Sequence, residues 1–157
     1  GALTGALNRV TFDEEFRSAL SLAARNGSSV CLILFDLDHF KRINDAHGHT
    51  AGDLVLSAVG RAVDELASEP HAFARVGGEE FAVLFLGTLT EAADFAEKLR
   101  ETVKNLDVVY EGKRIALSTS VGVATSSGGT PASVYEAADK QLYRAKESGR
   151  DRVCVPK

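Results

Sequence analysis

The chain has 157 residues, of which 45% are apolar and 25% are charged, a composition typical of one globular domain. Its 18 basic and 22 acidic side chains give a net charge of −4, which excludes a broad cationic surface for duplex DNA or anionic lipid. No apolar run approaches the roughly 20 residues that span a bilayer. We therefore expect no membrane contact from this segment and a cytoplasmic location, which also suits two isolated cysteines as free thiols.

No repeat or linker divides the sequence, so residues 1–157 are expected to form a single domain. The chain contains no methionine and begins Gly-Ala-Leu-Thr. We expect it to be a segment of a longer protein, which could be anchored to a membrane through segments that are not present.

Apolar periodicity predicts most of the secondary structure in chain order. Residues 11–24, 50–67 and 90–105 have helical spacing, and a further helix is expected to open at Pro131 after Thr130 and to end at Gly149. A short helix is expected to start near residue 39. Strands are predicted over 29–37, 72–76, 79–86, 108–110, 114–116, 118–124 and, at an edge, 152–155.

Two hairpins shape the predicted sheet. Gly77-Gly78 is interpreted as a two-residue turn, because such turns demand the positive φ that glycine tolerates. A second turn is expected at residues 111–113. Hairpins are incompatible with a purely parallel sheet, so the fold class is α/β in the form of an α+β sandwich, with a mostly antiparallel central sheet and flanking helices.

Acidic residues are predicted to meet at one edge of this sheet. The strand over 29–37 ends in acids, and alternation places Asp36 and Asp38 on one side. If the strand that starts at Glu79 runs antiparallel to it, Asp36 and Glu79 become neighbours. Carboxylates that meet in this way favour a hard cation such as Mg²⁺, although each acid taken alone would be explained as a solvated strand end.

Several motifs resemble one family when they are taken in order. The string Gly77-Gly78-Glu79-Glu80-Phe81 resembles the signature of GGDEF domains, in a GGEEF form. Its companions span nearly the whole chain: Leu3-Thr4-Gly5 with Asn8-Arg9, FDLDHFKRINDAHGHTAGD over 35–53, Ser120-Val121-Gly122-Val123-Ala124, and a closing pattern from Ala138 to Arg150. Asp151 stands where the family usually has Asn.

The resemblance implies a fold similar to adenylyl cyclases and polymerase palm domains, within a longer bacterial signalling protein. It also implies a diguanylate cyclase, a nucleotidyltransferase that condenses two GTP into cyclic di-GMP and two pyrophosphates across a homodimer. Asp36, Glu79 and the backbone carbonyl of Leu37 would bind Mg²⁺, with Mn²⁺ as a substitute. Asp36, Glu79 and Glu80 would be the catalytic residues, with Glu80 either supporting the metal or assisting removal of the 3′-hydroxyl proton.

The same resemblance assigns guanine recognition to Asn44 and Asp53. A carboxylate can accept hydrogen bonds from the ring N–H and the amino group of guanine together. Asp53 has a competing interpretation, because residues 50–53 match a capping box in which Asp53 closes onto its own helix start.

The remaining substrate-binding residues concern the phosphates and the base pocket. Backbone N–H groups of His39, Phe40 and Lys41 would cradle phosphates at a helix start, and Lys41 could add its side-chain cation. Lys146 and Arg150 would hold the β- and γ-phosphates, although cations are also favoured at a helix C-terminus by its dipole. Leu56 could line the base pocket or simply pack.

Two expectations qualify the activity. Many relatives carry an inhibitory product site of the form RxxD, but Ser68 and His71 stand at its two ends here, so this site is predicted to be absent. The alternative to an enzyme is a catalytically silent module that binds GTP or cyclic di-GMP and signals through a partner. Retention of the acids favours the enzyme.

Overall fold

The computed structural model describes residues 6–126 and 129–157, so the Leu3-Thr4-Gly5 motif lies outside the described residues. Helices and strands are intermixed along the chain, as the sequence predicts. The elements are α1 (Arg9–Asn26), β1 (Val30–Leu37), α2 (Phe40–His47), α3 (His49–Leu66), β2 (Ala72–Arg75), β3 (Glu80–Leu86), α4 (Leu89–Lys104), β4 (Val108–Tyr110), β5 (Lys113–Ile115), β6 (Thr119–Ser126), α5 (Pro131–Glu147) and β7 (Arg152–Cys154).

Five strands form the central sheet in the order β2-β3-β1-β6-β7. All neighbours are antiparallel except β6 and β7, which are parallel, so the predicted mostly antiparallel sheet is confirmed. The run of aliphatic and aromatic residues in β1 makes it the central strand, because its two faces both need cover. Strands β4 and β5 form a separate hairpin.

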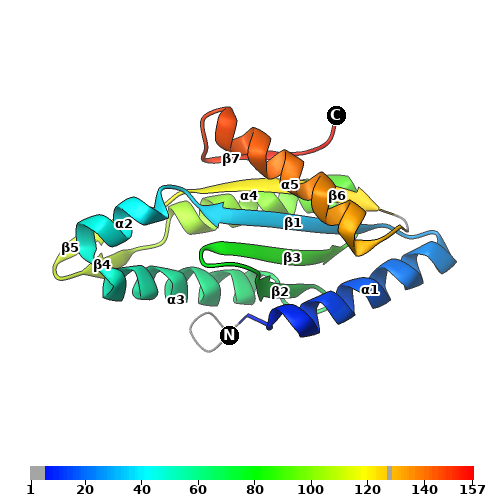
Figure 1. Ribbon diagram of the computed structural model, residues 1–157, viewed down its shortest axis with the longest axis horizontal. Coiled ribbons are helices and arrows are strands. Elements are labelled where there is room, and N and C mark those ends of the chain that lie inside the picture. Colours follow the sequence, from blue (N-terminus) through cyan, green and yellow to red (C-terminus); the bar gives the residue numbers. More distant parts are fainter. Residues whose placement is uncertain (1–5, 127–128) are drawn as a thin grey trace.

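The two faces of β1 feed two hydrophobic cores. Cys31, Ile33 and Phe35 pack with residues of α3 and α4, whereas Leu32 and Leu34 pack with residues of α1 and α5. Figure 1 shows these helices on the sheet and places α2 beyond the carboxyl end of β1. Within the described residues, no helix combines the length and apolar content that crossing a bilayer requires.

Side-chain caps begin three of the helices. Asn8 accepts from the backbone N–H of Thr11 at the start of α1, Thr88 and Glu91 form a reciprocal capping box at α4, and Thr130 caps α5 ahead of its first-turn proline. Helix α3 differs, because it begins at His49 after Gly48 and has no side-chain cap. The capping-box interpretation of Asp53 is therefore wrong.

Both predicted turns differ in detail from the structure. Strand pairing between β2 and β3 ends at Arg75 and Phe81, which leaves four residues, 76–79, between the strands. Gly77 and Gly78 are not among the residues with positive φ, so the predicted two-residue turn is wrong. The loop is instead held by Arg75, whose Nε donates to the carbonyls of Gly77 and Gly78 at 3.1 and 2.9 Å.

The second hairpin is tighter than predicted. Its turn contains only Glu111 and Gly112, both with positive φ (49° and 78°), and β5 begins one residue earlier than expected. Two consecutive residues in the left-handed region are the signature of a type I′ turn.

Gly122 of β6 sets how closely α5 approaches the sheet. A Cβ added there would lie 2.2 Å from the backbone nitrogen of Leu142 and 2.5 Å from the carbonyl oxygen of Ala138, both in α5. Because these neighbours are backbone atoms, no rotamer change could make room. A residue without a side chain at position 122 therefore allows α5 to lie directly on β6.

Substitution of Gly122 by Ala should destabilise the protein by about 1–3 kcal/mol, the usual range for overpacking a tight interior. Urea unfolding monitored by circular dichroism measures this change. Gly78→Ala is the matched control, because a Cβ at Gly78 would meet nothing within 4 Å. Equal stabilities of the two variants would contradict the role assigned to Gly122.

Candidate functional site

A polar cavity of about 210 Å³ lies at the carboxyl end of β1. Its walls come from the end of β1, the start of α2, the loop before β3 and the end of α5. The residues that line it are Asp36, Leu37, Asp38, His39, Phe40, Lys41, Glu79, Lys146 and Arg150. The fold thus brings together most of the predicted site residues from segments more than 100 positions apart in the sequence.

Asp36 lies in the middle strand of the sheet, between Glu80 on β3 and Ser120 on β6. Only 13% of its side chain is exposed, and the ammonium nitrogen of Lys146 lies 2.5 Å from its Oδ2. Burial raises the pKa of Asp36, and the hydrogen bond and charge of Lys146 act in the opposite direction. Asp36 is thus a poorly hydrated carboxylate with one bound cation.

The two glutamates after the double glycine lie differently. Glu80 is the direct cross-strand partner of Asp36 and is half-buried, whereas Glu79 is exposed in the loop and lines the cavity with Asp36. Burial raises the pKa of Glu80, and the nearby charges of Asp36 and Asp139 raise it further. The antiparallel arrangement expected from the sequence is confirmed, with Glu80 rather than Glu79 in register.

These donors suit a divalent cation that keeps part of its water shell. Asp36 and Glu79 supply carboxylates, and Leu37 lines the same cavity. Among residues 6–126 and 129–157, no three His, Cys, Asp or Glu side chains form a complete metal cage. Mg²⁺ is commonly held by one or two carboxylates together with substrate phosphates. Lys146 already places a positive charge on Asp36.

The start of α2 lies at the cavity, which His39, Phe40 and Lys41 line. His39 has a left-handed conformation (φ 56°) and precedes the helix without a side-chain cap. The first N–H groups of a helix have no intrahelical acceptor and favour anions. The Lys41 side chain is instead largely exposed and pairs with Asp45 at 3.1 Å.

Lys146 and Arg150 reach the cavity from the end of α5. Arg150 has left-handed backbone geometry (φ 64°), and its N–H donates to the carbonyl of Ala145 at 2.9 Å. This turn directs the chain after α5 back to the cavity, so both predicted phosphate-binding cations line it.

Asp38 has a structural role that sequence reasoning missed. It is buried, and its carboxylate accepts from the hydroxyls of Ser118 and Ser120 at 2.7 and 2.6 Å and from the backbone N–H of Asp151 at 3.0 Å. Asp38 therefore ties the end of β1 to β6 and to the turn that carries Arg150. No local sequence pattern links these residues.

Asp151 adds a second tie. Its carboxylate forms ion pairs with Arg100, at 2.7 Å, and with Lys104, both on α4. Although burial opposes the shift, these two cations lower the pKa of Asp151. The acid that replaces the usual Asn thus attaches the last turn to α4.

The predicted guanine-binding residues are not among the described residues that line this cavity. Asp53 is exposed on α3, and Leu56 is buried in the core. The Oδ1 atom of Asn44 is buried and has no hydrogen-bond partner among the described residues. A Cβ at Gly52 would lie only 1.9 Å from this atom, so glycine is required for Asn44 to occupy its place.

His71, for which no functional role is predicted, supports the edge of the sheet. Its Nδ1 accepts from the backbone N–H of Leu86 at 3.1 Å, and its ring stacks on Phe85. Burial lowers the pKa of His71, which favours the neutral ring that this hydrogen bond needs.

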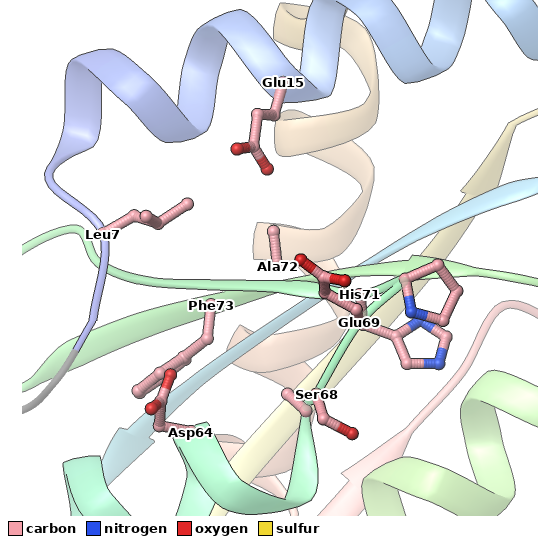
Figure 2. A pocket seen from close by; sticks show the side chains of 10 residues that line it. Leu7, Glu15, Asp64, Ser68, Glu69, His71, Ala72 and Phe73 are labelled. Atoms are coloured by element: carbon pink, nitrogen blue, oxygen red, sulfur yellow. The ribbon is translucent and has the colours of Figure 1, made fainter.

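His71 and Ser68, at the positions where the sequence predicts that an RxxD site is absent, also line a cavity of about 770 Å³ (Figure 2). Figure 2 shows Glu15 from α1 and Asp64 from α3 around it, and Glu69 also lines it. Carboxylates around a cavity disfavour anionic ligands. The charge of this wall is therefore opposite to what a phosphate-bearing product would need.

The raised pKa of Glu80 predicts a pH-dependent gain in stability when its charge is removed. A raised folded-state pKa means that Glu80 stabilises the fold below its unfolded pKa of about 4.3 and that this contribution is lost as the pH rises through the folded value. Glu80→Gln should therefore raise the melting temperature at pH 7.5 by a few degrees, and the gain should vanish below about pH 4.

Differential scanning calorimetry over this pH range measures the effect, with Glu136→Gln on the exposed face of α5 as a control. A lower melting temperature of Glu80→Gln at pH 7.5 would show that the buried charge is stabilising after all.

Comparison with known proteins agrees with this geometry. The family model described as diguanylate cyclase, GGDEF domain, matches residues 2–152. The uncharacterized protein YhcK of Bacillus subtilis is 41% identical over 97% of the chain, and the diguanylate cyclase DgcP of Pseudomonas aeruginosa is 37% identical over 98%. The chain spans only 44% and 23% of these two proteins.

Solved structures match equally well. The GGDEF domain of DgcB from Caulobacter crescentus, in complex with c-di-GMP, superposes with a TM-score of 0.93 at 36% identity, covering 98% of this chain and 92% of that one. SiaD of P. aeruginosa, in complex with its activator SiaC, superposes with a TM-score of 0.95 at 35% identity, covering 99% and 61%. The chain therefore belongs to the GGDEF domain family of diguanylate cyclases.

Proposed function

We propose that this chain condenses two GTP molecules into cyclic di-GMP and two pyrophosphates, with Mg²⁺ at Asp36, Glu79 and the carbonyl of Leu37. The observation that carries the proposal is the single cavity in which these residues meet Lys146, Arg150 and the amino end of α2. Carboxylates suited to a cation and groups suited to phosphates therefore line the same cavity.

The reaction needs positioning and charge compensation more than covalent chemistry. The ribose 3′-hydroxyl of one GTP attacks the α-phosphorus of the other, its proton is lost, and pyrophosphate leaves; a second round closes the ring. Lys146, Arg150 and the N–H groups of residues 39–41 bind the phosphate oxygens. Mg²⁺ would neutralise charge developing on the phosphoryl group.

Glu80 is proposed to assist the loss of the 3′-hydroxyl proton or to support the metal. Its half-buried position beside Asp36 and its raised pKa suit a group that accepts a proton more readily than an exposed glutamate.

Asn44 and Asp53 are proposed to select guanine. The support is the buried Oδ1 of Asn44, which lacks a hydrogen-bond donor among the described residues, and the exposed carboxylate of Asp53, which is free of a capping role. Adenine lacks the adjacent ring N–H and amino group from which a carboxylate could accept two hydrogen bonds. Leu56, in contrast, is explained by packing.

One domain presents one GTP, so we propose that two copies face each other as a homodimer during catalysis. In that case the activity per chain rises with protein concentration until the dimer is saturated.

Purified protein incubated with GTP and Mg²⁺ should give cyclic di-GMP, identified by mass, and should give no cyclic dinucleotide from ATP alone. Glu79→Ala should lower the rate at least 100-fold, because a metal ligand is lost. Asp53→Ala should mainly raise the GTP KM and weaken discrimination against ATP.

Glu101→Ala, an exposed substitution on α4, is the matched control and should retain full activity. Running the assay over a range of protein concentrations tests the dimer. GTP binding without any product in the unmodified chain would favour the silent binding module instead.

The acidic cavity at Ser68 and His71 predicts that cyclic di-GMP does not inhibit through that surface. Calorimetric titration of a Glu79→Ala, Asp53→Ala double variant with cyclic di-GMP should therefore show no tight binding. Tight binding that disappears when Ser68 or His71 is also replaced would contradict this prediction.

A further inference from the structure

We propose that Lys146 is an internal counter-ion of Asp36 that a divalent cation must displace, so that metal and nucleotide bind cooperatively. The inference rests on the proposed function, because it concerns how that same site is filled.

The carboxylate of Asp36 would be costly in free energy without a cation beside it. Its side chain is 13% exposed and lies between Glu80 and the buried Ser120 in the middle of the sheet. A desolvated carboxylate beside another acid is costly unless a cation compensates it. Lys146, with its Nζ 2.5 Å from Oδ2, provides that compensation.

A metal ion and the ammonium group of Lys146 exclude one another at the carboxylate of Asp36. Mg²⁺ binds carboxylate oxygens at about 2.0–2.1 Å. With a divalent ion on Asp36, an ammonium group at the same carboxylate would meet strong like-charge repulsion. Lys146 must therefore move when the metal enters.

Lys146 can move to a second anionic partner in the same cavity. Its side chain is 37% exposed and has a flexible four-carbon stem, so it can swing while Ala145 and Leu142 of the same helix remain buried. The cavity that it lines also contains Arg150 and the start of α2, where an anion would lie. Nucleotide phosphates are the anionic partner that Lys146 gains when it leaves Asp36.

The exchange gives Lys146 opposite effects on ligand binding in the absence and in the presence of nucleotide. Without nucleotide, Lys146 competes with the metal and lowers its affinity. With nucleotide, Lys146 stabilises the phosphates, so each ligand raises the affinity of the other, and the effect is reciprocal. A lysine that only bound phosphate would leave the affinity for metal alone unchanged.

The test is Mn²⁺ binding to the nucleotide-free protein, measured by electron paramagnetic resonance. Lys146→Met, which keeps an unbranched side chain only one atom shorter and removes its charge, should bind Mn²⁺ at least fivefold more tightly than the unmodified protein. The same variant should bind a non-hydrolysable GTP analogue at least tenfold more weakly in the presence of Mn²⁺. Lys140→Met, exposed on the same helix, should match the unmodified protein in both measurements.

Thermal unfolding provides a second readout if the variant is less stable. Mn²⁺ should raise the melting temperature of Lys146→Met more than that of the unmodified protein, and Asp36→Asn should abolish both increases. An unchanged, weakened or undetectable Mn²⁺ affinity in Lys146→Met overturns the inference. Product formation by the unmodified chain in that case leaves the proposed function standing, whereas tighter Mn²⁺ binding without any cyclic di-GMP overturns the proposed function alone.

Discussion

The structure around the cavity depends on one poorly hydrated charge, the carboxylate of Asp36 in the central strand. Antiparallel pairing on both sides places Glu80 and Ser120 next to it, and α5 covers the face on which it lies. A carboxylate in this position cannot be hydrated fully, so a cation must come from the protein or from a ligand. Lys146 comes from α5, which lies directly on β6 because Gly122 has no side chain. The packing of α5 on the sheet and the cation beside Asp36 are therefore linked through one helix.

Asp38 and Asp151 fix the turn that carries Arg150 to the cavity. Both Arg150 and Asp151 have left-handed backbone conformations, which side chains other than glycine adopt at a cost. Asp and Asn tolerate this region better than most residues, so the backbone accepts either at position 151. The carboxylate adds ion pairs to Arg100 and Lys104 that an amide could not form. The departure from the family pattern thus keeps the turn and attaches it more firmly to α4.

Sequence reasoning predicted the elements whose patterns are local. The apolar run of β1, the helical spacing of α3, and the cap and proline that open α5 each identify an element without knowledge of its neighbours. The meeting of Asp36 with the acids after Gly78 followed from a single further assumption, antiparallel pairing. The features that could not be predicted depend on side chains reaching across the fold. Arg75 holds the loop over 76–79 open, and Asp38 bonds to residues about 80 and 113 positions away. The ion pair between Lys146 and Asp36 likewise depends on how α5 packs on the sheet.

Neither the backbone conformation nor the packing of the described residues requires glycine at the two positions before Glu79. Neither Gly77 nor Gly78 has positive φ, a Cβ at Gly77 would make only ordinary contact with Glu80, and one at Gly78 would meet nothing. Backbone conformation and packing therefore leave room for side chains at both positions. Glycine also serves where a ligand must approach the backbone closely. Arg75 already fixes this loop, and Glu79 leads from it into the cavity. The absence of side chains here would let the proposed nucleotide approach the backbone of the loop closely, whereas no contact among the described residues requires either glycine.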